Sequence, residues 1–252
     1  MGGQLTAPME LKEIIVITDG KSNVGGDPAG AALLAHKKGI IVNAIGIMDR
    51  GETEEPYIEL ENIAKAGGGI CDIIPLSMLG YSVQMVTMQS VQMTIERAVS
   101  RQLRQITGYS LEDMEPDSRS RILEYIQKVG NEVSLKCVVA LDCSGSMRSR
   151  IKTALGSVQD LLISLKTRKG RSYLGIVAFP GGAGRDSKVI SGFTDDFDQL
   201  ALRLNRIKTG GPTPTYGGIV QASCLFDGET RHGDSFLASV YPEEGDERSF
   251  IL

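Results

Sequence analysis

Apolar and polar positions divide the chain into alternating strand-like and helix-like segments. Several continuous apolar runs of strand length end in polar or glycine residues, which is typical of strands buried on both faces of a parallel sheet. The runs that we predict as such strands are LKEIIVITDG (11–20), IIVNAIGI (40–47), ICDIIPL (70–76) and VSLKCVVALD (133–142).

Helical patterns separate and follow these strands. In the first of them, Asp27 is a suitable N-cap, Pro28 fits the first helical position and Gly39 is a C-terminal stop signal. Other helices are predicted within 54–69, 79–106, 110–130, 151–165, 195–208 and 209–226, and an antiparallel hairpin within 172–191. Strands that alternate with helices indicate parallel pairing with helices on both faces. The predicted fold class is therefore α/β, with a Rossmann-like, doubly wound, mostly parallel sheet.

The helical pattern over 79–106 is long and rich in methionine. Val83, Val86 and Ser90 fall along one side, and Met85 and Met88 extend its apolar surface. Such a surface could form a groove for a partner. We favour packing against the sheet, because an amphipathic stripe normally faces the core.

The composition limits the classes of protein to which the chain can belong. The 252 residues suffice for one large α/β domain, and the formal charge of −4 is spread over both signs. This charge balance excludes a basic surface that binds nucleic acid and a polybasic patch that binds a membrane. Cys71, Cys137 and Cys224 lie in apolar segments, and no CxxC pair or histidine cluster suggests a zinc site. Reduced thiols of this kind fit a cytoplasmic location, which we expect here.

Oxygen-bearing side chains lie where predicted strands end. Asp142, Ser144 and Ser146 close one strand, and Asp19 ends the strand IIVITDG in the same manner. Two threonines alternate in the glycine-rich loop TGGPTPT (209–215). Open α/β sheets bind ligands at the carboxyl ends of their strands, and carboxylate and hydroxyl oxygens suit Mg²⁺. The sequence therefore predicts a divalent-metal site, for which Mn²⁺ and Ca²⁺ also qualify.

The segments DCSGS, GGPTPT and VITDG resemble the three motif loops of the von Willebrand factor A domain and its metal-ion-dependent adhesion site. In that family the serines and sometimes the threonine contact the metal, the aspartates often act through water, and a partner's carboxylate completes the shell. The resemblance selects Thr213 over Thr215, because the family's threonine is the first of a T-x-T pair. It implies the metal ligands Asp142, Ser144, Ser146, Thr213 and Asp19.

The order of the motifs differs from the family's, in which DxSxS comes first and the second aspartate comes last. Here Asp19 comes first, so the whole chain is similar to permuted von Willebrand A-like proteins of spore-forming bacteria. We predict one circularly permuted domain over 1–252, with the fold's second half at 11–106, a helical connection at 107–131, the first half at 132–226 and a flexible tail at 227–252. Half-domains could instead pair between chains. We favour a monomer, because loop-closure entropy grows slowly with length and the long connection can close.

These observations favour a metal-dependent protein-binding module and not an enzyme. Its partner would be a protein that offers Asp or Glu to the metal. One alternative is a metal-assisted hydrolase, but His36 lies within a predicted helix and His232 in the tail, so neither is placed as a general base. Another is an assembly subunit with half-domains paired between chains. A third is that the serines simply cap the next helix, which leaves Asp19 and Thr213 unexplained.

Overall fold

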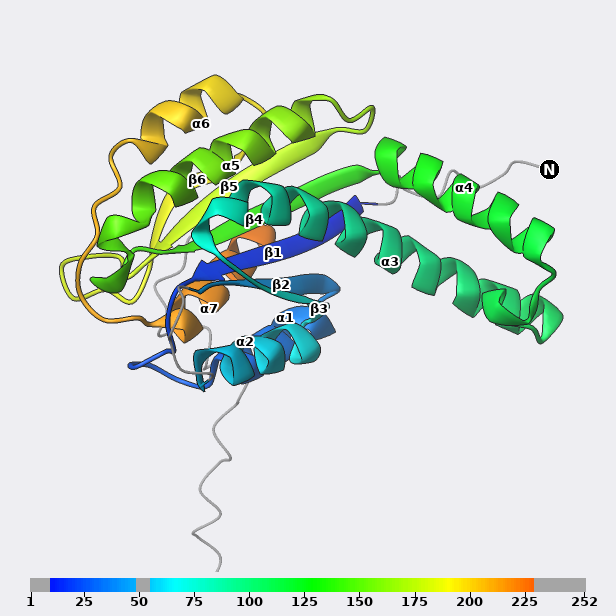
Figure 1. Ribbon diagram of the computed structural model, residues 1–252, viewed down its shortest axis with the longest axis horizontal. Helices are drawn as coiled ribbons and strands as arrows, with labels where there is room; N and C mark the ends of the chain where they lie inside the picture. The colour runs from blue at the N-terminus through cyan, green and yellow to red at the C-terminus, as the bar shows by residue number, and fades with distance from the viewer. Residues whose placement is uncertain (1–9, 49–54, 229–252) are drawn as a thin grey trace, which may run out of the picture.

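The computed structural model describes residues 10–48 and 55–228. Within them, six strands form one sheet in the order β3-β2-β1-β4-β5-β6, parallel throughout except for the antiparallel pair β5 and β6 (Figure 1). The strands are β1 (Glu10–Thr18), β2 (Ile40–Ile47), β3 (Gly68–Ile74), β4 (Ser134–Asp142), β5 (Ser172–Phe179) and β6 (Lys188–Thr194). This mostly parallel α/β sheet confirms the predicted fold class.

Helices cover both faces of the sheet (Figure 1). On one face lie α3 (Leu79–Thr107), α5 (Ile151–Lys166) and α6 (Phe197–Leu204). On the other lie α1 (Pro28–Lys37), α2 (Glu55–Ala66) and α7 (Thr215–Phe226). The predicted cap of α1 is confirmed, because the Asp27 carboxylate accepts the backbone N–H groups of Ala29 and Gly30, each at 3.0 Å.

The core has one apolar layer on each face of the sheet. Along β1, Ile15 and Ile17 pack with the helices of the first face, whereas Ile14 and Val16 pack with those of the second. Neighbouring residues of a strand point to opposite faces, so a strand buried on both sides must be apolar at nearly every position. This is why the continuous apolar runs identified the strands.

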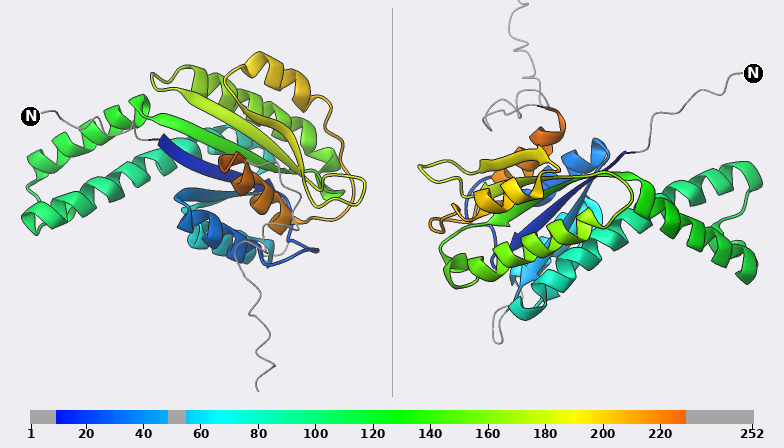
Figure 2. Two further views of the ribbon diagram at one scale, coloured as in Figure 1. Left: turned by 180° about the vertical axis from the view of Figure 1, so that it is seen from behind. Right: turned by 90° about the horizontal axis from the view of Figure 1, so that it is seen from above.

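A helical hairpin connects strands β1 to β3, which come first in the chain, with strands β4 to β6, which come after it. Helix α3 runs along α5, continues past the end of the sheet and turns back into α4 (Pro116–Glu132), which leads into β4 (Figures 1 and 2). Gly108 ends α3 with a φ of 78°, a left-handed conformation that favours glycine. The predicted connection, 107–131, corresponds to the tip of this hairpin and to α4.

The apolar stripe of α3 is only partly confirmed. Val83, Val86 and Ser90 are buried, as expected for a face that packs on the core. Met88 is 60% exposed, so the prediction that it faces the sheet is wrong. The predicted flexible tail lies outside the described residues after Gly228, and so does His232. In the described ranges, no helix is long and apolar enough to cross a membrane.

Candidate metal centre

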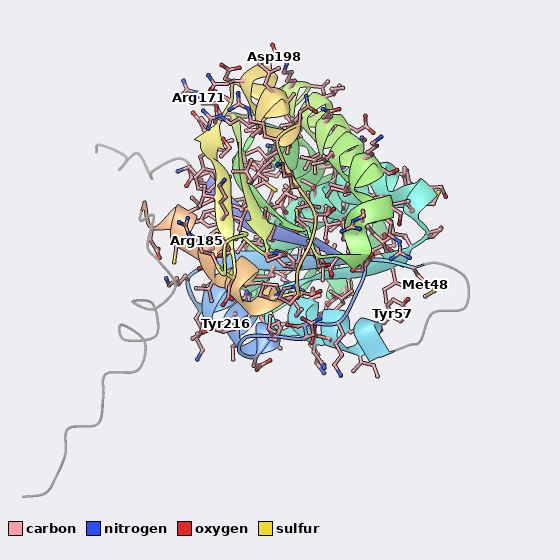
Figure 3. The ribbon with its side chains drawn as sticks, turned by 90° about the vertical axis from the view of Figure 1, so that its left-hand side faces the viewer. Met48, Tyr57, Arg171, Arg185, Asp198 and Tyr216 are labelled. Atoms are coloured by element: carbon pink, nitrogen blue, oxygen red, sulfur yellow. The ribbon has the colours of Figure 1, made fainter. Side chains whose placement is uncertain are left out.

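The site lies at the edge of the sheet where β1, β4 and β5 end, which we call the carboxyl edge. Strands β1 and β4 are adjacent and parallel, and their register pairs Ile17 with Leu141. The next residues, Thr18 and Asp142, therefore reach the edge side by side. Figure 3 views the molecule from this side, with Arg185 labelled on the loop between β5 and β6 and Tyr216 labelled at the start of α7.

Asp142 is fully buried and held at both carboxylate oxygens. The Thr18 hydroxyl donates to Oδ2 at 2.5 Å, and the Ser144 backbone N–H donates to Oδ1 at 2.7 Å. Each contact comes from a different segment, so Asp142 fixes its own loop against the end of β1. Charge-assisted hydrogen bonds of this kind are the strongest that neutral donors make.

The side chains of the two serines and Asp19 are also joined by hydrogen bonds. The Ser144 and Ser146 hydroxyl oxygens lie 2.9 Å apart, and Ser146 donates to Asp19 Oδ1 at 2.7 Å. Asp19 belongs to the loop after β1, 127 residues before Ser146 in the chain. The structure therefore brings together four of the predicted site residues, Asp142, Ser144, Ser146 and Asp19, which we call the oxygen cluster.

Backbone hydrogen bonds hold Thr213 at the same edge of the sheet. Its N–H donates to the Asn23 side-chain oxygen at 2.8 Å, and its carbonyl oxygen accepts the Ser22 hydroxyl at 3.1 Å. The Gly211 carbonyl accepts the Gly145 N–H at 3.1 Å, which ties the threonine loop to the DCSGS loop. Gly211 has a φ of 87°, which explains the need for glycine in this loop.

Three residues at the edge were missed by the sequence analysis. Thr18 holds Asp142, Asn23 holds the backbone of Thr213, and Arg150 pairs with Asp19, with Nη1 at 2.5 Å from Oδ2. Thr18 lies within the segment VITDG and Arg150 lies shortly after the segment DCSGS, but nothing in their spacing showed which carboxylate each would meet.

The carboxyl group of Asp142 has a raised pKa. Burial raises the pKa of its carboxyl to about 6 from an ordinary value of 3.8, and the charge of Asp19 adds to the rise. The hydrogen bonds from Thr18 and Ser144 oppose it. A carboxylate that has lost much of its hydration is stabilised by a nearby cation.

The donor set fits a hard divalent cation. Among the described residues, no three His, Cys, Asp or Glu side chains are grouped to hold a metal, but here carboxylates act together with hydroxyls. Oxygen ligands at right angles around an octahedral Mg²⁺ lie about 2.9 Å apart, and the hydroxyls of Ser144 and Ser146 have this separation. In the part of the chain that the structure describes, the buried hydroxyl of Thr215, the first residue of α7, lacks a hydrogen-bond partner.

Helix capping does not account for the serines. Helix α5 begins at Ile151 after a short 3-10 turn, Ser146–Ser149. Among the described residues, no side chain caps either the turn or the helix by a hydrogen bond. The hydroxyls of Ser144 and Ser146 instead contact each other and Asp19.

Comparisons with known proteins agree with this fold. A family model described as von Willebrand factor type A domain matches residues 137–236, from within β4 past the end of α7. Together with the mostly parallel sheet, this defines a protein of the von Willebrand factor type A fold.

The chain belongs to the same family as the uncharacterized protein YabS of Bacillus subtilis (strain 168). The two are 34% identical over 220 residues, which cover 86% of this chain and 89% of YabS. The crystal structure of an uncharacterized protein from Alicyclobacillus acidocaldarius is 38% identical, with a TM-score of 0.81 over 92% of this chain and 97% of that one.

More distant structures add no argument. Proximal thread matrix protein 1 from the mussel byssus, solved with a zinc-occupied MIDAS motif, is 18% identical and has a TM-score of 0.28. The similarity covers 84% of this chain and 45% of the mussel chain.

Proposed function

We propose that this chain is a metal-dependent protein-binding module, in which the oxygen cluster and Thr213 form a metal-ion-dependent adhesion site. The observation that carries the proposal is the hydrogen-bonded run from Ser144 through Ser146 to Asp19, which joins hydroxyls and a carboxylate from two loops. A bound Mg²⁺ would supply a positive charge and an open coordination position for an Asp or Glu side chain of a partner protein. Mn²⁺ and Ca²⁺ suit the same donors.

Each residue has a role that follows from its contacts. Ser146 donates its proton to Asp19, so Ser144 is the donor in the bond between the two serines, and a bound cation would take the place of that proton at the Ser146 oxygen. Asp142 acts as a charge that Thr18 and the Ser144 backbone hold in place. Residues that orient metal ligands in this way typically change metal affinity by about 10- to 100-fold.

The proposal includes a circularly permuted order and a site completed within one chain. Asp19 follows β1 and the two serines follow β4, and these strands are neighbours in one sheet. The family model matches 137–236, the part that carries the DxSxS loop and the threonine loop. The shared sheet supports a site closed within a monomer, and the matched range supports an order in which the N-terminal part supplies the motif that comes last in the unpermuted family.

We also propose that the site binds and does not catalyse. The histidine that the structure describes, His36, lies on α1 with its ring beside Gly68, the first residue of β3. Because β3 is parallel to its neighbour β2, its first residue lies at the edge opposite the carboxyl edge. His36 is therefore too remote to act as a general base at the oxygen cluster.

Replacing Ser146 with alanine tests the proposal. The variant loses one predicted ligand and the hydrogen bond to Asp19. We expect wild-type protein to bind one Mn²⁺ or Mg²⁺ per chain in a calorimetric titration. Ser146→Ala should bind at least about tenfold more weakly.

Ser149→Ala is the matched control, because Ser149 is an exposed serine of the same turn. It should bind metal as wild type does. If wild-type protein takes up no divalent cation, or if both variants bind like wild type, the proposed function is wrong. Partner binding that is equally tight in EDTA would also contradict it.

A further inference from the structure

A cavity of about 540 Å³ lies between α3, α4 and α5, at the base of the helical hairpin where α4 leads into β4 (Figure 1). Leu135, the second residue of β4, lines it, so the cavity lies at the end of the sheet opposite the carboxyl edge. At about 3.3 Å per residue, β4 spans roughly 23 Å from Leu135 to Asp142. A molecule bound in this cavity would therefore not touch the oxygen cluster.

The cavity has the size and the lining of a small-molecule site. Cavities of about 300–1,000 Å³ with apolar walls and a few polar groups are typical of such sites. The apolar side chains that line this one are Met88, Val91, Leu135, Leu161 and Leu165. Met88, which does not face the sheet, is thus part of the cavity wall. This lining suits an organic molecule with an apolar body.

Arg168, two residues after the end of α5, is a half-buried cation that also lines the cavity. Its guanidinium donates to the backbone carbonyls of Gly130 and Val133, at 2.7 and 3.0 Å, and to the Ser172 hydroxyl at 2.8 Å. All three acceptors are neutral, and within the described ranges Arg168 forms no ion pair. A guanidinium has more N–H groups than these bonds use, so it can donate to a further ligand.

The positive charge of Arg168 is not neutralised by the carboxyl groups around it. Burial raises the pKa of Glu13 to about 8, so at neutral pH this carboxyl is protonated and uncharged. Burial lowers the pKa of Arg168 and the charge of Glu13 opposes this, but a guanidinium remains charged in a folded protein. Glu124 and Lys128 of α4 also line the cavity and have opposite charges. The lining therefore has the net charge of Arg168 alone, which favours an anionic ligand.

We propose that this cavity binds a small organic acid, whose apolar body packs against Leu161 and Leu165 and whose carboxylate pairs with Arg168. A guanidinium and a carboxylate form charge-assisted hydrogen bonds that are about twice as strong as those between neutral groups. The bonds to Gly130 and Val133 already fix the arginine side chain. Binding an acid therefore costs little further ordering of this group.

A second cavity, of about 490 Å³, is also lined by Arg168. Among the described residues, its aliphatic lining is limited to Leu165, and its other side chains include Lys166, Arg171 and Asp195. It offers an apolar body much less contact than the first cavity does. Arg171 lines the second cavity and not the first, so its replacement shows which of the two holds the acid.

The proposal can be tested with 4-phenylbutyrate and its neutral analogue 4-phenylbutanamide. Each is titrated into the full chain by calorimetry at neutral pH in EDTA, so that no metal can bind the carboxylate. Wild type should bind one molecule of the acid per chain, at least about tenfold more tightly than the amide. Arg168→Gln should weaken acid binding about tenfold and change amide binding little. Arg171→Gln, the matched control, should bind both compounds as wild type does.

A second variant leaves the arginine in place, because Arg168→Gln also removes the hydrogen bonds to Gly130 and Val133. Ser164, on α5, lines the cavity, and phenylalanine at this position would fill part of it. Ser164→Phe should keep the circular dichroism spectrum of wild type and should bind both compounds at least about tenfold more weakly.

Several results would overturn the proposal. It is wrong if wild type binds no 4-phenylbutyrate, or if acid and amide bind equally well. Loss of acid binding in Arg171→Gln would place the acid in the second cavity and would also contradict it. So would a folded Arg168→Gln or Ser164→Phe protein that binds the acid as tightly as wild type.

Discussion

Replacing Asp142 with asparagine is expected to stabilise the metal-free protein while it abolishes tight binding of divalent cations. Burial raises the pKa of this carboxyl to about 6 from 3.8. Well above pH 6, folding therefore places a charge where it is poorly hydrated. The cost is about 2–3 kcal/mol, because each pKa unit corresponds to about 1.4 kcal/mol. Asparagine has nearly the same shape and no charge to bury.

The loss of metal binding has a separate cause. Asp142 supplies one of the two carboxylates of the oxygen cluster, so the variant should bind Mn²⁺ about 100-fold more weakly. Urea unfolding of the metal-free chain and a calorimetric Mn²⁺ titration measure the two effects. Asp160→Asn, an exposed aspartate on α5, should change neither. An Asp142→Asn protein that is less stable than wild type without metal would contradict the electrostatic argument.

A second large effect is expected at Glu13, on the central strand β1. This side chain is 2% exposed, and Asn43 donates to its Oε2 at 3.3 Å and to the Ser90 hydroxyl at 3.2 Å. Burial raises the pKa of Glu13 to about 8 from 4.5, opposed by hydrogen bonds from Ser90, Cys137 and Asn43 and by the charge of Arg168. Glu13 is therefore protonated in the folded protein at neutral pH.

The sign of the pH effect follows from proton counting. Between pH 4.5 and about 8 the folded state holds a proton on Glu13 that the unfolded state has lost. The free energy of unfolding therefore falls as pH rises through this window, by on the order of 5 kcal/mol, and is flat above it. Glu13→Gln should abolish this dependence and be more stable than wild type at the alkaline end.

Urea unfolding near both ends of the window measures this difference. Glu124→Gln on α4 is the control, because Glu124 is an exposed carboxyl on a helix and should leave the pH dependence unchanged. Equal slopes of stability against pH in wild type and Glu13→Gln would show that Glu13 is ionised in the folded state, contrary to this account.

The strands were the most predictable part of the fold. The run 40–47 coincides with β2 because every one of its residues is buried between two helical layers. The cap at Asp27 was also predictable, because it depends on residues adjacent in sequence. Glu13 was not singled out, since the strand pattern alone does not show that Asn43 and Ser90 will meet it. Met88 was misplaced because a broad apolar pattern on a long helix does not reveal which edge of the stripe faces solvent.

The candidate site was predictable as a set of residue types but not as a set of contacts. Asp142, Ser144, Ser146 and Asp19 stand at strand ends, and parallel strands end at one edge, so their meeting could be expected. The hydrogen-bond or ion-pair partner of each side chain could not be predicted. That Arg150 meets Asp19 depends on how α5 starts relative to the loop after β1, a tertiary detail with no local signal.

The hairpin of α3 and α4 divides the chain between the two loops that form the oxygen cluster. A cut at its tip, next to the exposed Gly108, would give one fragment with Asp19 and another with Asp142, both serines and Thr213. Loop tips of this kind tolerate cleavage best. Neither fragment would contain both carboxylates. This architecture is therefore suited to a split reporter, in which metal binding signals that the two fragments have reassembled.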